Sequence, residues 1–158
     1  MIQRTEVLSH LAQLFSQHPD AHIFDSLPGA ADLLAPGLLA KFGDHRDRFP
    51  TPASVQALAG TCPVTKKSGK RKIVIFRRRC DREFRRIVQQ FARLSVRQSG
   101  WALAYWRDLR PRCRSDSDAY RRLANRWLAI IWKMWQDGKA YDETYHLQQR
   151  ALRRRPKS

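Results

Sequence analysis

The stretch Lys66–Arg86 is the feature that most restricts how this chain can fold. It holds eleven Lys or Arg residues against only Asp81 and Glu83. The cations surround the step Ser68-Gly69, lead into the β-branched run 73–76 and continue onto the start of an expected helix. A hydroxyl group set among so many cations is suited to meet a phosphate group. We therefore interpret the segments on either side as a scaffold and clamp for this stretch.

The net charge of the whole chain indicates the same kind of partner. The 158 residues include 31 Lys or Arg and 14 Asp or Glu, for a formal net charge of +17. Such a field attracts polyanions, because their binding releases condensed counterions. DNA, RNA or an anionic membrane surface would fit. No apolar run approaches the ~18 residues that cross a bilayer, and the N-terminus lacks a signal-peptide pattern, so we expect no membrane partner.

Cysteines and acidic residues give no sign of a metal site in this chain. Cys62, Cys80 and Cys113 are odd in number and widely spaced, without a CxxC pair or a histidine at a zinc-ligand spacing. We expect three reduced thiols and no zinc. The acidic residues are scattered, and none lies near Ser68 in sequence. Metal-assisted chemistry at Ser68 would therefore need carboxylates from elsewhere.

Length and periodicity predict one mainly α-helical domain. Residues 2–17 place apolar side chains roughly on one face of a helix, which His18-Pro19 ends. Because this pattern starts almost at the first residue, we expect 1–19 to be the end of a coiled-coil-like helical linker. Residues 20–140 would form the main domain, and 141–158 a short helix with a basic tail.

The segment Ser26–Ala31 reads Ser-Leu-Pro-Gly-Ala-Ala and precedes an apolar run that reaches Phe42. A Leu-Pro-Gly turn before a helix is typical of the helix-hairpin-helix motif, which aims backbone N–H groups and the helix dipole at a DNA phosphate. Ala31 stands where the usual second glycine would be, and a positive φ there would be strained. Two interpretations stay open: a DNA-contacting hairpin and a purely structural turn.

The middle of the chain predicts a short helix, a basic loop and a long helix. Thr51-Pro52 starts a helix over 53–59 that stops at Gly60. Ser68 then falls in a loop, and 73–76 is a short strand or extended segment. Asp81 is expected to cap one amphipathic helix that continues to about Trp106, with core residues on one face and arginines on the other. We expect that arginine face to meet nucleic acid.

The C-terminal part predicts a second long helix. Ser115 or Ser117 can cap it, and Gly138 ends it. Its tryptophans, Trp127, Trp132 and Trp135, could stack on nucleic-acid bases. Their helical spacing favours the core instead.

The order of these motifs resembles the C-terminal domain of the IS110 insertion-sequence transposases, also grouped under IS116 and IS902. The matching pieces are, in order, Ser26-Leu27-Pro28-Gly29, Gly43-Asp44, Arg48-Phe49, Leu58-Ala59-Gly60, Pro63, Ser68-Gly69-Lys70, the basic run and Phe84-Arg85. The resemblance covers about residues 20–140. Two departures stand out: Ala31 replaces the usual glycine, and Arg79-Cys80-Asp81 replaces a common Arg-Gly-Asn step.

In that family an N-terminal resolvase-like domain holds acidic metal ligands, the C-terminal domain supplies a serine that attacks DNA, and a structured RNA guides site choice. The resemblance therefore implies that Ser68 is the catalytic nucleophile. It also implies that Mg²⁺ belongs to a missing N-terminal domain, that the full-length protein is a homo-oligomer, and that it is cytoplasmic and nucleoid-associated. This chain alone would be inactive.

We thus expect the C-terminal part of a transposase that binds DNA and a guide RNA for strand cleavage and rejoining. The alternatives are a non-catalytic helix-hairpin-helix DNA-binding module and, with less support, an RNA-binding protein that lacks the common sheet-borne aromatic motifs. The expected nucleic-acid contacts come from the hairpin glycine and the cations around and after Ser68: Gly29, Lys66, Lys67, Gly69, Lys70, Arg71, Lys72, Arg77, Arg78, Arg79, Arg82, Arg85 and Arg86.

Overall fold

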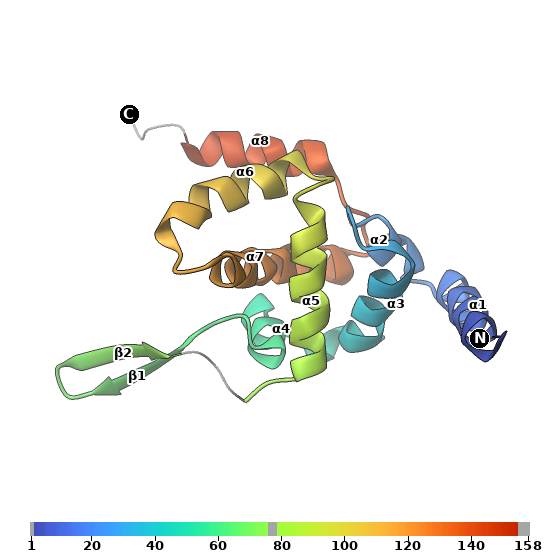
Figure 1. Cartoon of the computed structure of the whole chain (residues 1–158), viewed down its shortest axis with the longest axis horizontal. Coiled ribbons are helices and arrows are strands. Elements are labelled where there is room, and N and C mark those ends of the chain that lie inside the picture. Colours follow the sequence, from blue (N-terminus) through green and yellow to red (C-terminus); the bar gives the residue numbers. More distant parts are fainter. Residues whose placement is uncertain (1, 76–78, 155–158) are drawn as a thin grey trace.

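A bundle of helices forms the body of the protein, and a two-stranded hairpin extends away from it (Figure 1). The computed structural model describes residues 2–75 and 79–154, of which residues 2, 65–67 and 75 are described by their backbone. In chain order the elements are α1 (Ile2–Gln17), α2 (Ala21–Asp25), α3 (Ala31–Phe42), η1 (Arg46–Arg48), α4 (Pro52–Ala59), β1 (Val64–Ser68), β2 (Arg71–Ile75), α5 (Arg82–Ser95), α6 (Gly100–Leu109), η2 (Arg110–Arg112), α7 (Asp116–Asp137) and α8 (Glu143–Arg154). The prediction of a mainly helical fold is confirmed.

Helix α7 is the centre of the core, and α4, α5 and α6 pack against it. The ring of Phe42 on α3 lies within 6.0 Å, between ring centroids, of four aromatic rings, which belong to Phe24, Phe49, Phe84 and Trp135. Edge-to-face packing of this kind adds to the burial of apolar area. The core therefore depends on aromatic residues contributed by segments far apart in the chain.

The three tryptophans of α7 belong to the core, as their spacing predicted. Trp127 and Trp135 are fully buried, and Trp132 is half-buried. Each indole N–H has an acceptor: Trp127 donates to Ser95 Oγ at 2.9 Å, Trp132 to the Phe49 carbonyl at 2.7 Å, and Trp135 to the Gly43 carbonyl at 3.1 Å. Burial without such partners would be costly. The fully buried rings of Trp127 and Trp135 are therefore not available to stack on a base.

Local capping residues explain where several helices begin and end. Thr51 and Ser54 form the reciprocal hydrogen bonds of a capping box at the start of α4, and Gly60 ends that helix in the left-handed region with φ 70°. The Ser115 side chain accepts from the Asp118 backbone N–H at the start of α7, and Gly138 ends it with φ 65°. The predicted boundaries of both helices are confirmed.

The prediction of one helix from Asp81 to about Trp106 is wrong. Helix α5 ends at Ser95, and Ser99 begins α6 by accepting from the Ala102 backbone N–H at 3.1 Å. The break turns the chain so that Trp101 packs edge-on against Trp127, 5.1 Å between ring centroids. A serine cap thus prevails over an apolar pattern that continues past the bend.

Helix α1 leaves much of its apolar face in solvent. The helix itself is confirmed, but Val7 is 66% exposed and Leu14 55% exposed. Its contacts within the bundle are with α2 and α3. In the described part of the chain, no helix has the length and apolar character that crossing a membrane requires.

Candidate nucleic-acid interface

Ser68 ends the first strand of an antiparallel β-hairpin instead of lying in a loop. Strand β1 pairs with β2 in the register Val64↔Ile75, Lys66↔Ile73, Lys67↔Lys72 and Ser68↔Arg71. The predicted loop is therefore wrong for the segment Val64–Ser68. The predicted extended segment is confirmed for Ile73–Ile75 but starts two residues earlier, at Arg71, and Phe76 lies outside the described residues.

The turn residues account for this hairpin. Gly69 has φ 58°, whereas Ala31 is the only described non-glycine residue with a positive φ. A positive φ at the first of two central residues is the pattern of a type II′ turn, with Gly69 first and Lys70 second. The signal was present in Val64-Thr65 and in a glycine between two short extended runs. Lys66 and Lys67, which lie between these β-branched residues and the turn, obscured this hairpin signal.

Ser68 is exposed beside cationic residues. Residues directly opposite in an antiparallel pair share one face, so Ser68 and Arg71 lie on the same side of the hairpin. Lys70, Arg71 and Lys72 are exposed as well. A Cβ built on Gly69 would meet no atom within 4 Å. A phosphate backbone could therefore approach the turn without steric obstruction.

No acid–base partner or metal cluster accompanies Ser68 in the described residues. Among the side chains that the structure describes, none forms a hydrogen bond with the Ser68 hydroxyl. Within residues 2–75 and 79–154, no three His, Cys, Asp or Glu side chains come together in a group that could hold a metal ion. The residues beside Ser68 are cations, which do not fit a magnesium site. We therefore derive no metal-dependent step from these residues.

The two carboxylates of the basic stretch are both held by one lysine. Lys41 on α3 donates to Asp81 and to Glu83, at 2.9 Å in each case. These hydrogen bonds raise the pKa of Lys41, and the bond from Lys41 lowers the pKa of Asp81. Asp81 also caps α5 by accepting from the Phe84 backbone N–H at 3.0 Å. Both acids are thus occupied by α3 and by the helix start.

The arginines at the start of α5 are only partly free. Arg79, Arg82 and Arg86 are exposed. Arg85 is half-buried, forms an interaction of its own, and would lie with its Cδ 3.7 Å from a Cβ on Gly60. Lys66 and Lys67 are placed by their backbone in β1, and Arg77 and Arg78 lie outside the described residues. The hairpin tip and the exposed arginines together form the candidate interface.

The hairpin leaves the body and returns to it at nearly one point. The Asp81 backbone N–H donates to the Leu58 carbonyl at 2.7 Å. A Cβ on Gly60 would lie 2.6 Å from Cys80 Sγ, so only glycine fits there. The segment between these residues therefore begins and ends against the same part of α4.

Gly29 packs against the backbone of α5. It is buried, with φ 89°, and an added Cβ would lie 3.0 Å from the backbone carbon of Leu94 on α5. Ala31 adopts φ 49°, the strained conformation expected where the usual glycine is replaced. The residues exposed at the start of α3 are Ala31, Asp32 and Leu33, and the Asp32 carboxylate would repel a phosphate. This geometry favours the structural-turn interpretation of the segment Ser26–Ala31.

Comparison with known proteins shows which proteins this chain is similar to. Residues 21–107 match the family described as Transposase IS116/IS110/IS902. The chain is 30% identical over 129 residues to the mini-circle putative transposase for IS117 from Streptomyces coelicolor, covering 82% of the chain and 31% of that protein. It is 29% identical to the IS900 42 kDa protein of Mycobacterium paratuberculosis, covering 83% of the chain and 33% of that protein.

A third relative, the IS110 43.6 kDa protein of Streptomyces coelicolor, is 28% identical over 89% of the chain and 35% of its own length. The chain thus spans about a third of these relatives. The match of the family covers more than half of the chain and includes the hairpin with Ser68. The chain belongs to the IS116/IS110/IS902 family of insertion-sequence transposases.

Proposed function

We propose that this chain is the DNA-contacting part of a transposase and that Ser68 is its nucleophile. The observation that carries the proposal is the position of Ser68 at the tip of an exposed hairpin, directly opposite Arg71 and next to an unobstructed Gly69. The serine oxygen would form a bond to phosphorus, and the departing sugar oxygen would take the electron pair of the broken bond. Attack by a second sugar hydroxyl on that phosphoserine ester would rejoin the strand and release the serine.

The cations of the hairpin would serve this reaction electrostatically. Negative charge accumulates on the phosphoryl oxygens in the transition state, and fixed cations stabilise it. Arg71 and Lys70 are exposed beside Ser68 and can do this. The serine proton must pass to a base, which we expect from outside the described residues, together with the carboxylates that would hold Mg²⁺.

The wider partners follow from the exposed arginines and the charge. Arg79, Arg82 and Arg86 extend the cationic surface from the hairpin onto α5. We expect this surface to bind DNA and a structured guide RNA within a homo-oligomer of the full-length, nucleoid-associated protein. The support is the net charge of +17 and the family.

The test is a covalent protein–DNA adduct that survives denaturation. With the acidic part of the enzyme supplied in trans, the wild-type chain should form the adduct and Ser68→Ala should not. Ser16→Ala, at an exposed serine on α1, is the matched control and should retain it. If Ser68→Ala still forms the adduct, Ser68 is not the nucleophile. Equal DNA binding by both proteins with no adduct in either would favour the non-catalytic DNA-binding module.

Salt dependence tests the phosphate contacts separately from the chemistry. The logarithm of affinity for duplex DNA falls with the logarithm of salt at about 0.9 per phosphate contacted. Replacing Arg71 and Lys72 by Gln should therefore flatten the slope by about 2. Replacing Arg107 and Arg114, two exposed arginines outside the hairpin, removes the same charge and should change the slope less. An unchanged slope in the hairpin variant would remove this turn from the interface.

A further inference from the structure

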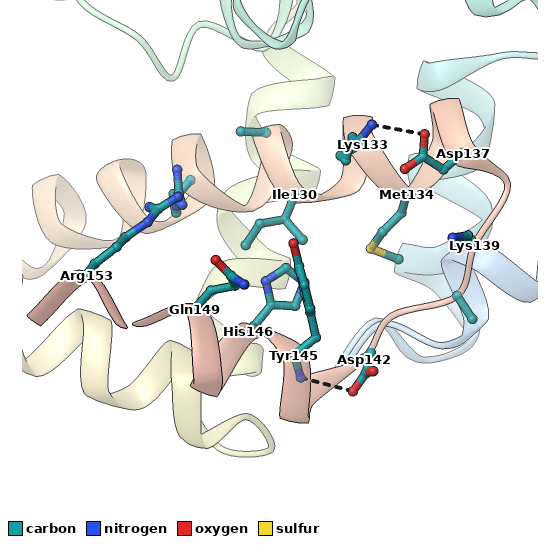
Figure 2. Close-up of a pocket in the computed structure, with 13 residues that line it drawn as sticks. Ile130, Lys133, Met134, Asp137, Lys139, Asp142, Tyr145, His146, Gln149 and Arg153 are labelled. Atoms are coloured by element: carbon teal, nitrogen blue, oxygen red, sulfur yellow. Dashed lines mark hydrogen bonds and ion pairs between the residues drawn. The ribbon is translucent and has the colours of Figure 1, made fainter. Parts of the chain in front are cut away.

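A cavity of about 580 Å³ lies between α7 and α8, away from the hairpin. Figure 2 shows Ile130 and Met134 extending into it from α7, and Tyr145, His146 and Gln149 from α8. Its volume is within the range of small-molecule sites, roughly 300–1,000 Å³. Its lining residues, from Arg126 to Arg153, lie outside the stretch 21–107 that matches the family. None of the predicted site residues takes part in it.

Two arginines, Arg126 and Arg153, line one end of this cavity. Arg126 is half-buried, and no described residue forms a hydrogen bond or ion pair with its guanidinium. Burial and the nearby Arg153 guanidinium hold the pKa of Arg126 below its ordinary value. A half-buried cation that faces a like charge is unfavourable unless an anion joins them. The pair is therefore arranged to receive an anionic group.

The acidic residues of the cavity do not neutralise these arginines. Asp137 pairs with Lys133 at 3.1 Å, and the Asp142 side chain accepts from the Tyr145 backbone N–H at 3.2 Å (Figure 2). Lys139 adds a further exposed cation to the lining. The lining holds the cations Arg126, Lys133, Lys139 and Arg153 against the carboxylates Asp137 and Asp142, so its net charge is positive.

The middle of the cavity is a slot with an aromatic wall. Tyr145 is 53% exposed and meets His146 edge-on, with 5.3 Å between ring centroids. His146 stacks on Tyr141, with a centroid distance of 5.1 Å and an interplanar angle of 11°, which fixes its ring. Burial, with a smaller contribution from Arg126, lowers the pKa of His146, so its ring is neutral at pH 7. Ile130 and Met134 form the opposite, aliphatic wall (Figure 2).

The slot is preformed because α8 is anchored at both ends. Glu143 accepts from Ser99 Oγ at 2.8 Å and from the Trp101 backbone N–H at 2.8 Å. Further along α8, Arg150 donates to the Ala104 carbonyl at 3.1 Å and pairs with Asp108. These contacts hold α8 against α6.

We propose that this slot binds one unpaired nucleotide of a nucleic-acid strand, with the base between Tyr145 and Met134 and the phosphate at Arg126 and Arg153. An aromatic face, an apolar wall and a pair of cations are the elements by which proteins hold a single unstacked base and its phosphate. The proposal rests on the proposed nucleic-acid partner but not on the role of Ser68. The slot would be a second nucleic-acid contact site, separate from the hairpin.

The experiment measures binding of the full chain to a 12-nucleotide strand that carries one 2-aminopurine, as RNA and as DNA, alone and paired with its complement. Tyr145→Ala should weaken binding of the single strand about tenfold and abolish the fluorescence change of the 2-aminopurine on binding. Tyr145→Phe keeps the ring and should stay within about twofold of wild type. Binding of the paired strand should be equal in all three proteins.

The anion-binding end is tested by Arg126→Gln, with Arg122→Gln as the matched control, because Arg122 pairs with Asp118 and is not among the lining residues of the cavity. Only the first should weaken single-strand binding. The proposal is overturned if Tyr145→Ala and Tyr145→Phe lose affinity equally, if paired and single strands are affected alike, or if poly-Glu displaces the strand as well as unlabelled strand does. A comparison of RNA with DNA reports which sugar the slot prefers, and a preference for either supports the proposal. A Tyr145 effect without any Ser68 adduct would leave the slot in place and remove the catalytic role.

Discussion

The helical body buries its apolar side chains, whereas the hairpin exposes them to solvent. In the body, Phe91 and Trp127 are fully buried and pack edge-on at 5.0 Å between centroids. On the hairpin, Ile73 and Val74 are 57% and 60% exposed, and each strand packs chiefly against the other (Figure 1). A two-stranded hairpin alone is at best marginally stable in water. The comparison teaches that the stability of this protein and its candidate chemistry reside in different parts of the chain.

The largest expected effect separates the two regions by truncating one apolar residue in each. Phe91→Ala should lower the free energy of unfolding by about 4 kcal/mol, because it leaves a cavity in the core. Ile73→Ala should change it by less than about 0.5 kcal/mol, because its side chain is already in solvent. Urea unfolding followed by tryptophan fluorescence measures both. A loss of several kcal/mol in Ile73→Ala would mean that the hairpin belongs to the core.

The next effect concerns a half-buried ion pair of the body. Arg46 donates to both oxygens of Asp20, at 2.7 and 2.8 Å, and Asp20 is 8% exposed. Asp20→Ala should cost about 2 kcal/mol, because it removes both carboxylate acceptors and leaves Arg46 with only the Asp44 carbonyl and the Trp135 ring. Thermal unfolding measures the loss. A variant as stable as wild type would show that the pair contributes nothing.

This pair also predicts a pH dependence for the body. The hydrogen bonds from Arg46 lower the pKa of Asp20 in the folded protein. The stabilisation is therefore present above the unfolded-state pKa of about 3.9 and is lost as the pH falls through the folded value. The segment Val64–Ile75 contains no carboxylate, so acid should destabilise the helices without altering the charge of the hairpin.

Two glycines in the left-handed region give a smaller and more exact comparison. Gly29 has φ 89° and an added Cβ would lie 3.0 Å from the Leu94 backbone, whereas Gly69 has φ 58° and open space around it. Gly29→Ala should therefore cost about 2 kcal/mol of global stability. Gly69→Ala should leave the unfolding midpoint of the helices unchanged and reduce only the hairpin amide protection in hydrogen exchange. Equal losses of global stability would contradict the separation of the two regions.

The smallest expected effect lies in α8. Burial lowers the pKa of His146 in the folded protein. The unfolded chain then binds more protons than the folded one, so stability falls as the pH drops below about 6.5 and levels off below the folded pKa. His146→Gln should remove this part of the pH dependence between pH 5 and 7. A variant with an unchanged profile would assign the dependence to another group.

Local signals predicted the elements whose ends are marked by their own residues. The cap Ser115 and the stop Gly138 defined α7, and Thr51-Pro52 with Gly60 defined α4. The break at Ser99 was missed because apolar residues continue at helical spacing on both sides of it. The hairpin was missed because two lysines stand between its β-branched residues and its turn.

Contacts between distant segments could not be predicted in the same way. The pairing of Lys41 with Asp81 and Glu83 joins residues about forty positions apart, and only the packing of α3 against α5 brings them together. The cavity beside Arg126 exists because α8 is held by Ser99 and Trp101 at a bend that the sequence pattern concealed. For the candidate site, the sequence indicated Ser68 and its cations, but it did not indicate the strand pairing that presents them.

The hydrogen bond between Leu58 and Asp81 at the base of the hairpin has a consequence for how the family can diversify. The chain between these residues leaves the helical body and returns to it at one narrow neck. The contacts that close this neck do not involve the hairpin strands. Insertions, deletions or replacements in the hairpin would therefore leave the helices undisturbed. The family could thus change the length and sequence of the hairpin without a change in the helical fold that carries it.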